Sequence, residues 1–156
     1  MTRCAIGIDP GANGAIVAVD DDGRLLYWAD TPSVDKGSAS AELLAPLLAD
    51  FVRACTVDGR RLVGVAVERV AAMPRQGVSS TFKFGTSYGI ARMAAAVMAG
   101  AVTGCQIITP TPSKWKRALG LSSDKAASRA MAVQHWPADA GLIRRVLGTD
   151  RAEAAL

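Results

Sequence analysis

The chain has 156 residues, half of them hydrophobic, which suffices for one buried core but not for two ordinary domains, so we expect a single domain over residues 1–156. No apolar run reaches the roughly 20 residues of a membrane span, and the N-terminus lacks a signal-peptide pattern, so neither membrane insertion nor export is expected. The net charge of +4 and a pI near 9.3 favour a polyanionic partner such as nucleic acid.

Cysteine and histidine are too few and too scattered for several common sites. Cys4, Cys55 and Cys105 lie far apart without a C-x-x-C pair, so they predict small core residues in a reducing compartment rather than disulfides or a zinc site. His135 is the only histidine, which excludes a His-rich metal centre. We therefore expect carboxylates to carry any hydrolytic chemistry.

The first thirty residues alternate apolar runs with turn signals. The runs Arg3–Asp9, Ala15–Val19 and Leu25–Ala29 are separated by Pro-Gly-Ala-Asn-Gly and by Asp-Asp-Asp-Gly. This alternation predicts three strands joined as a meander.

A helix and a buried strand are predicted next. Apolar residues at helical spacing indicate a helix through positions 43–52, with Pro46 in its first two turns, where proline costs least. The run Leu62–Val67 is rich in β-branched residues, which is typical of a strand buried on both faces, and it ends at Glu68.

The second half of the chain is predicted to be mainly helical. A loop over Arg69–Val78 leads to a long helix, capped by Ser79 or Ser80, that closes at Gly100. The C-terminal expectations are a strand at Cys105–Thr109 and helical segments at Ser113–Leu119, at Asp124–Trp136 with Ser122 or Ser123 as cap, near Leu142–Leu147, and from Asp150 onward. This order predicts an α/β fold, a mixed five-stranded sheet made of a three-stranded meander plus two parallel strands, with helices on its faces.

Asp9 and Glu68 occupy equivalent places in this sheet. Each is the first charged residue after an apolar strand, so the two carboxylates converge if their strands are parallel neighbours. Ionised carboxylates at close range repel unless a cation lies between them, and oxygen ligands suit Mg²⁺ or Mn²⁺. Spacing alone leaves open the alternative that both are ordinary strand-end acids facing solvent.

Asp150 and Glu153 lie three residues apart at the start of a predicted helix, and hence on one face of it. Taken alone, this D-x-x-E pattern is more typical of helix capping. Together with Asp9 and Glu68 it gives four carboxylates from two strand ends and one helix, which is the set that a two-metal hydrolase requires. One ion would activate water, and a second, about 4 Å away, would stabilise the leaving 3′ oxygen.

Several motifs then occur in the order of a known family. They are G-I-D-P-G-A-N-G-A at 7–15, V-E-R-V at 67–70 and R-A-E-A at 151–154, together with M-P-R-Q-G-V-S-S-T-F at 73–82 and P-S-K-W-K at 112–116. The chain thus resembles the RuvC-type Holliday junction resolvases of the ribonuclease H-like superfamily, in particular their phage and plastid branches. The resemblance covers nearly the whole chain.

This resemblance implies a homodimeric endonuclease that resolves four-way DNA junctions by two symmetric nicks. Carried over residue by residue, it assigns metal binding and catalysis to four carboxylates: Asp9, Glu68, Asp150 and Glu153. It further implies two Mg²⁺ ions per active site, or Mn²⁺ in their place. Lys116 and Lys125 match the family's phosphate-contacting lysines, with Lys116 as a catalytic residue, while solvated surface lysines remain the alternative.

The last motif departs from the family pattern. Phage and plastid relatives often place a His or Asp four residues before the final Glu, where this chain has Thr149. Asp150, three residues before it, instead resembles the bacterial D-x-x-D spacing. Relatives also generally continue through the last helix, so we expect the helix that stops at Leu156 to be cut short.

Further DNA contacts are predicted around the loop that follows Glu68. Arg75 and Gln76 could read bases in an opened crossover, although a plain connecting loop is the alternative. The helical spacing of Phe82, Phe84 and Tyr88 favours core or dimer packing over stacking on bases. The predicted DNA-binding residues are Lys125, Lys114, Arg75, Gln76, Arg69 and Lys83.

Three rival functions fit parts of the pattern. The G-I-D-P-G segment also resembles the phosphate loop of actin-like and sugar-kinase ATPases, but those enzymes need two such domains, so no nucleotide cofactor is expected. A non-catalytic branched-DNA-binding protein and an RNA-directed nuclease both share the expected fold. For the resolvase we expect an intracellular location on DNA, in a bacterial or phage-infected cytoplasm, or in a plastid stroma after removal of a transit peptide.

Overall fold

The computed structural model describes residues 1–11, 13–33, 38–72, 75–143 and 149–156, with only the backbone of residues 142, 143, 149 and 150. In this part of the chain, five strands form one sheet in the order β3-β2-β1-β4-β5. The strands are β1 (Arg3–Asp9), β2 (Ala15–Asp20), β3 (Leu25–Asp30), β4 (Arg61–Val67) and β5 (Gln106–Ile108).

The sheet is mixed, as the sequence predicts. Strands β1, β2 and β3 pair antiparallel as a meander, whereas β4 pairs parallel with β1 on one side and with β5 on the other. The predicted α/β fold class is therefore confirmed. Because β1 and β4 are parallel neighbours, their carboxyl ends meet at the same edge of the sheet.

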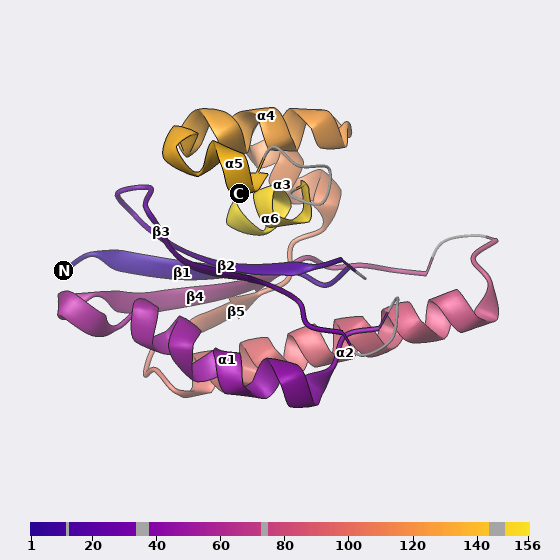
Figure 1. The fold of residues 1–156 in the computed structure, drawn as a ribbon, viewed down its shortest axis with the longest axis horizontal. Helices are drawn as coiled ribbons and strands as arrows, with labels where there is room; N and C mark the ends of the chain where they lie inside the picture. The colour runs from indigo at the N-terminus through magenta and orange to yellow at the C-terminus, as the bar shows by residue number, and fades with distance from the viewer. Residues whose placement is uncertain (12, 34–37, 73–74, 144–148) are drawn as a thin grey trace.

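Helices cover both faces of the sheet (Figure 1). Helices α1 (Ala41–Ala54) and α2 (Val78–Gly100) pack on one face and enclose the main core, which includes Ile6, Val65 and Phe51, all fully buried. The opposite face carries α3 (Pro112–Ala118), α4 (Lys125–His135), α5 (Ala140–Ile143) and α6 (Thr149–Ala155).

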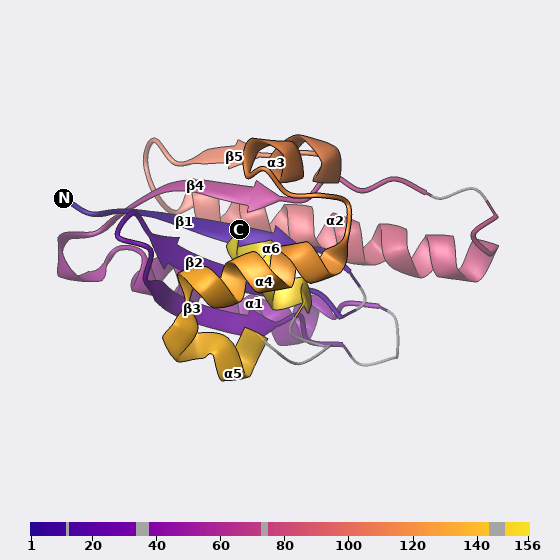
Figure 2. The ribbon, with the colours of Figure 1, turned by 90° about the horizontal axis from the view of Figure 1, so that it is seen from above.

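Helix α2 is longer than the sheet that it covers. Its first turns extend beyond the sheet edge at which β1 and β4 end, together with the loop that precedes them (Figure 2). The buried apolar residues of the helix all lie in its C-terminal half: Ala91, Ala94, Ala95, Met98 and Ala99. No helix in the described residues is long and apolar enough to span a bilayer.

Most predicted boundaries agree with the structure within one or two residues, and the capping residues are the main exceptions. Helix α2 begins at Val78 after Gly77, so Ser79 and Ser80 lie inside its first turn and neither is the cap. Asp124, rather than Ser122 or Ser123, caps α4, because its carboxylate accepts a hydrogen bond from the backbone N–H of Ala126 at 2.9 Å.

Three smaller differences follow from local geometry. The predicted strand at 105–109 is shortened to β5, which pairs only with residues 64–66 of β4. Two short 3₁₀ turns, η1 (Val57–Gly59) and η2 (Pro137–Asp139), were not predicted. Of the segment predicted at 142–147, only the first two residues, at the end of α5, belong to the described part of the chain. The expected core position of Cys4 and Cys55 is confirmed, and Cys105 is half-buried.

Candidate active site

The register between β1 and β4 brings Asp9 and Glu68 together. Ile8 pairs with Val67, and the backbone N–H of Glu68 donates to the carbonyl oxygen of Ile8 at 3.1 Å. Asp9 is the last residue of β1, and Glu68 follows the last residue of β4. Parallel pairing of β1 and β4 therefore brings these two carboxylates to the same edge of the sheet, as predicted.

The turn after β1 holds the Asp9 carboxylate. Its Oδ1 accepts the backbone N–H of Gly11 at 2.9 Å, and the turn closes with a hydrogen bond from the N–H of Gly14 to the carbonyl oxygen of Gly11 at 2.9 Å. A Cβ atom on Gly14 would lie 2.2 Å from the Asp9 carbonyl oxygen, so the turn requires glycine there. Gly11 and Gly14 of the P-G-A-N-G motif thus hold Asp9 in a defined orientation.

Glu68 is a desolvated carboxylate with one defined partner. The indole N–H of Trp115, on α3, donates to Glu68 Oε1 at 2.9 Å. Burial raises the pKa of Glu68, and the carboxylate of Glu153 raises it further, while the Trp115 hydrogen bond and the ammonium groups of Lys116 and Lys125 act in the opposite direction. The ionised form of Glu68 is therefore costly unless a cation is near.

Glu153 supplies the third carboxylate from α6. Its side chain is only 6% exposed, and its Oε1 accepts hydrogen bonds from the ammonium of Lys116 at 2.8 Å and from the hydroxyl of Ser128 at 3.3 Å. The Nζ atom of Lys125 lies 4.0 Å from the other oxygen, Oε2. Lys116 is itself buried, whereas the Lys125 side chain is 67% exposed, so the first lysine is fixed inside the site and the second stands at its mouth.

Helix α6 is anchored to the far side of the meander. Arg151 donates from Nε and Nη2 to the two carboxylate oxygens of Asp30, at 2.6 and 2.5 Å, and its guanidinium lies 4.2 Å from the centroid of the Trp28 ring. Because such a bidentate pair forms two parallel hydrogen bonds, it fixes the orientation of the Arg151 guanidinium relative to Asp30 as well as the distance between them. The R-A-E-A motif therefore combines an anchor, Arg151, with the predicted metal ligand Glu153.

The three carboxylates and the two lysines line one cavity of about 350 Å³ at the sheet edge, together with Phe84 from α2. The cavity wall includes the carboxylates Asp9, Glu68 and Glu153 and the lysines Lys116 and Lys125. Oxygen donors without sulfur or imidazole are the donor set that Mg²⁺ or Mn²⁺ prefers, so the residues present fit the predicted ions.

The carboxylates are near one another but are not arranged as a finished metal site. Among the side chains that the structure describes, no three acidic, histidine or cysteine groups gather closely enough to hold an ion as they stand. Glu153 instead pairs with Lys116. The side chain of Asp150, predicted as the fourth ligand, lies outside the described residues, and the metal-ligand assignments remain predictions.

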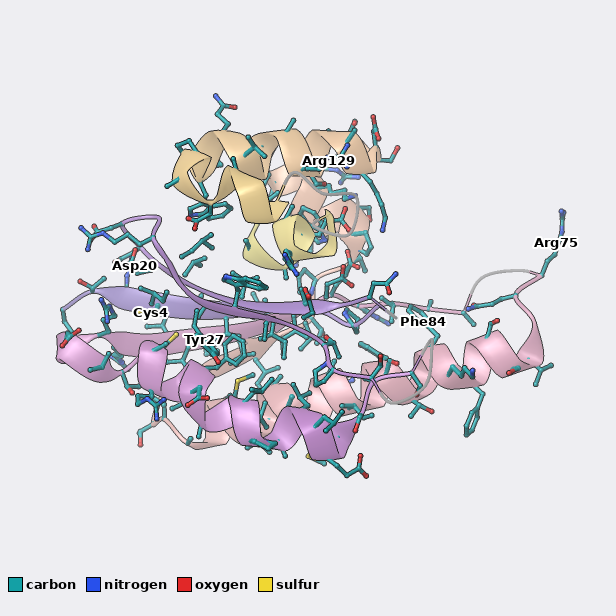
Figure 3. The ribbon with its side chains drawn as sticks, in the orientation of Figure 1. Cys4, Asp20, Tyr27, Arg75, Phe84 and Arg129 are labelled. Carbon is teal, nitrogen blue, oxygen red and sulfur yellow. The ribbon has the colours of Figure 1, made fainter. Side chains whose placement is uncertain are left out.

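The predicted DNA-binding residues fall into two groups. Lys125 lines the cavity, and Lys114 lines a neighbouring apolar cavity of about 410 Å³ between the sheet and α3 and α6. Arg75 lies at the outer end of the loop before α2, far from Phe84, as Figure 3 shows. Arg69, Gln76 and Lys83 line neither cavity. The motif residues 73 and 74 lie outside the described part of the chain.

The aromatic residues of α2 divide in a way that spacing did not predict. Tyr88 packs against the core, as expected, and Phe84 lines the cavity, but the Phe82 residue is 75% exposed. The first turns of α2 project past the sheet, so helical periodicity there does not correspond to a buried face.

Two residues of the site were missed at the level of sequence. Ser128 was not considered, although it follows Lys125 by one helical turn on the same face. Trp115 was noted only as a letter of the P-S-K-W-K motif. Nothing in the spacing indicates that its indole reaches Glu68, because the two residues are 47 positions apart.

Comparison with known proteins identifies the fold. No protein-family model and no curated protein matches the chain. Among solved structures, RuvC of Thermus thermophilus in complex with a Holliday junction substrate superposes with a TM-score of 0.57 at 20% identity, covering 98% of this chain and 90% of that one. A second Thermus thermophilus RuvC structure gives 0.59 at 19% identity, covering 97% and 90%. The chain therefore has the ribonuclease H-like fold of RuvC, as its motifs predicted.

Proposed function

We propose that this protein is a structure-specific endodeoxyribonuclease that resolves four-way DNA junctions by paired nicks, using divalent metal ions. The observation that carries the proposal is the cavity in which Asp9, Glu68 and Glu153 meet Lys116 and Lys125. The fold is that of a protein solved with a Holliday junction, which supports the same proposal.

Asp9, Glu68 and Glu153 would hold the ions, with Asp150, on the same helix as Glu153, as the predicted fourth ligand. Bound there, divalent ions would activate water for attack on the phosphodiester and stabilise the charge of the leaving oxygen. Asp9 is oriented for this by the N–H of Gly11, and Glu68 by the indole of Trp115. Ligands that are already oriented before the substrate binds lower the free-energy barrier of the reaction.

The two lysines would act on the DNA phosphate. Lys116 is buried beside Glu153. Its ammonium has therefore already lost most of its water, and it would contact the scissile phosphate without a further large desolvation cost. Lys125, at the mouth of the cavity, would neutralise a flanking phosphate. The net charge of +4 favours association with any nucleic acid, so the shape of the partner must supply the specificity.

Two nicks at one junction require two active sites, and we propose a homodimer. Helix α2 carries an exposed apolar stripe, Phe82, Met93 and Val97, and Ile107 and Ile108 of β5 are exposed as well. Cβ atoms on Gly85 and Gly89, on the same side of α2, would meet nothing within 4 Å, so these glycines do not pack against the sheet. A second copy would bury this surface and leave both cavities open.

The test is cleavage of a synthetic four-way junction with Mg²⁺ by the wild type and by Asp9→Asn. Symmetric nicks on the junction, absent from a linear duplex of equal length and from the Asp9→Asn reaction, would support the proposal. Junction binding by Asp9→Asn should persist, because the binding charge lies in Lys and Arg. Tight binding without cleavage by the wild type would instead favour a non-catalytic branched-DNA-binding protein.

A second set of substrates separates DNA from RNA. An RNA hairpin and an RNA/DNA hybrid offer the same phosphodiester chemistry with different helical shape. The resolvase should leave both intact under conditions that cut the junction. Preferential cleavage of either one would replace the proposal by an RNA-directed nuclease.

A further inference from the structure

We propose that Trp115 is a positioning residue that fixes the Glu68 carboxylate at the edge of the catalytic cavity. This inference rests on the function proposed above and adds to it a residue that no motif assigned. The observation is the direct hydrogen bond from the indole N–H to Glu68 Oε1 at 2.9 Å.

Trp115 contacts both halves of the site. Its ring edge holds Glu68, while the ammonium of Lys116 lies 5.2 Å from the ring centroid, within the range of a cation–π contact. Lys116 in turn donates to Glu153. The Trp115 indole therefore contacts both Glu68, which follows β4, and Lys116, the lysine that binds Glu153 of α6.

The hydrogen bond has a defined physical consequence. A glutamate side chain has several rotatable torsions, and fixing them costs free energy each time an ion binds. The N–H of Trp115 occupies Oε1 and leaves Oε2 to face a cation, so part of this ordering is already present. Outer-shell groups that orient a ligating carboxylate commonly change metal affinity or activity by roughly 10- to 100-fold.

The element that carries Trp115 is built to hold it in place. Helix α3 begins at Pro112, the Thr111 hydroxyl accepts the N–H of Lys114 at 3.3 Å, and the N–H of Arg69 binds the carbonyl oxygen of Pro110 at 2.7 Å. This last bond ties the start of the α3 segment directly to the residue after Glu68. The donor and the acceptor therefore belong to neighbouring, mutually fixed backbones.

A packing role is the competing explanation, because Trp115 also lines the apolar cavity of about 410 Å³ beside the site. Phe in place of Trp retains most of the ring and removes only the N–H donor. Trp136 offers a matched control, since its indole N–H also makes one hydrogen bond, to the carbonyl oxygen of Gly23 at 2.6 Å, but lies outside the site.

The hydrogen bond is tested first without any metal, by the indole N–H signals in a ¹H–¹⁵N correlation spectrum of the full chain. The signal of Trp115 is assigned by its loss in Trp115→Phe and that of Trp136 by its loss in Trp136→Phe. We expect Glu68→Ala to shift the Trp115 signal and to leave the Trp136 signal in place. An unchanged Trp115 signal would overturn the contact, whether or not Trp115→Phe folds well.

The positioning role is tested by Mn²⁺ titration calorimetry and by junction cleavage. Trp115→Phe should weaken Mn²⁺ binding and lower kcat by roughly 10-fold or more, with junction affinity unchanged. Trp136→Phe should leave both the Mn²⁺ affinity and kcat at wild-type values. Equal Mn²⁺ affinity and kcat in Trp115→Phe and the wild type would overturn the role, as would a wild type that binds no Mn²⁺.

These outcomes separate the inference from the proposed function. A wild type that binds Mn²⁺ but cuts no junction would remove the resolvase proposal, while the Mn²⁺ affinity of Trp115→Phe would still decide the role of Trp115. A wild type that cuts junctions, with an equally active Trp115→Phe, would remove only the inference.

Discussion

The backbones of Gly7 and Ala154 approach so closely that a Cβ atom on Gly7 would lie 1.8 Å from the carbonyl oxygen of Ala154. Gly7 lies two residues before Asp9 in β1, and Ala154 follows Glu153 in α6. Contact between the strand and the helix at this point brings the two carboxylates to one cavity. The glycine of the G-I-D-P-G motif thus serves the assembly of the site.

Gly7→Ala should therefore displace α6 and with it Glu153, because no rotation of a side chain can relieve a clash with backbone. We expect a lower melting temperature and loss of junction cleavage. The matched control is Gly64→Ala in β4, where a Cβ would meet its nearest atom, the Gln106 carbonyl oxygen, at an ordinary 3.6 Å. Equal cleavage by Gly7→Ala and Gly64→Ala would show that α6 docking does not depend on this contact.

Glu68→Gln should stabilise the metal-free protein at neutral pH while abolishing cleavage. Because the folded state raises the pKa of Glu68, its favourable contribution is complete below the unfolded pKa and is lost as pH rises through the folded pKa. At pH 7.5, above the unfolded pKa, Glu68 therefore lowers the free energy of unfolding, and Gln removes this unfavourable contribution. Thermal unfolding in EDTA measures the effect.

Glu42→Gln provides a control of opposite sign. Its own backbone N–H and the Ser40 hydroxyl lower the pKa of Glu42 at the start of α1, so its contribution is present above the unfolded pKa and is lost as pH falls through the folded one. The melting temperature of Glu42→Gln should fall slightly at pH 7.5. If Glu68→Gln also lowers the melting temperature, then burial of the Glu68 carboxylate does not destabilise the metal-free protein, and the prediction is wrong.

Lys116→Ala and Lys125→Ala should differ in their effect on the free energy of unfolding. Removing Lys116 leaves the buried Glu153 without its closest cation, which typically costs about 3–5 kcal/mol. Lys125 is largely exposed, so its removal should change stability by less than about 0.5 kcal/mol.

Urea unfolding and the salt dependence of junction binding measure the two effects. Both variants should lose cleavage and bind the junction with a shallower salt slope, but only Lys125→Ala should keep a native unfolding curve. A Lys116→Ala variant as stable as the wild type would mean that the Lys116–Glu153 pair contributes little to the fold.

Met93→Glu should convert a dimer into a monomer. Met93 is 65% exposed at the centre of the apolar stripe of α2, where a charge would be buried against the second copy. Val57→Glu, at an apolar residue outside the stripe that is 45% exposed, should remain dimeric. Light scattering coupled to size exclusion gives the masses, and a monomeric wild type would remove the dimer proposal.

The sequence by itself determined the elements and much of their order. Alternating apolar runs and turns predicted the meander, and a β-branched run predicted β4, because strand periodicity and turn chemistry are local properties. The same pattern placed Asp9 and Glu68 at strand ends. Capping residues were predicted less well. Gly77 and Asp124 are as suitable for the N-cap position as the serines near them, so the sequence alone does not decide which residue caps the helix.

The tertiary structure decided which residues meet. The indole of Trp115 reaches Glu68 across 47 positions, and Lys116 reaches Glu153 across 37, distances over which no periodic pattern carries information. The close approach of Gly7 to Ala154 and the Arg151–Asp30 anchor likewise depend on how α6 packs on the sheet. The sequence identifies each carboxylate, but not the group that it binds. Packing determines that group, because packing sets the distance between residues that are remote in the chain.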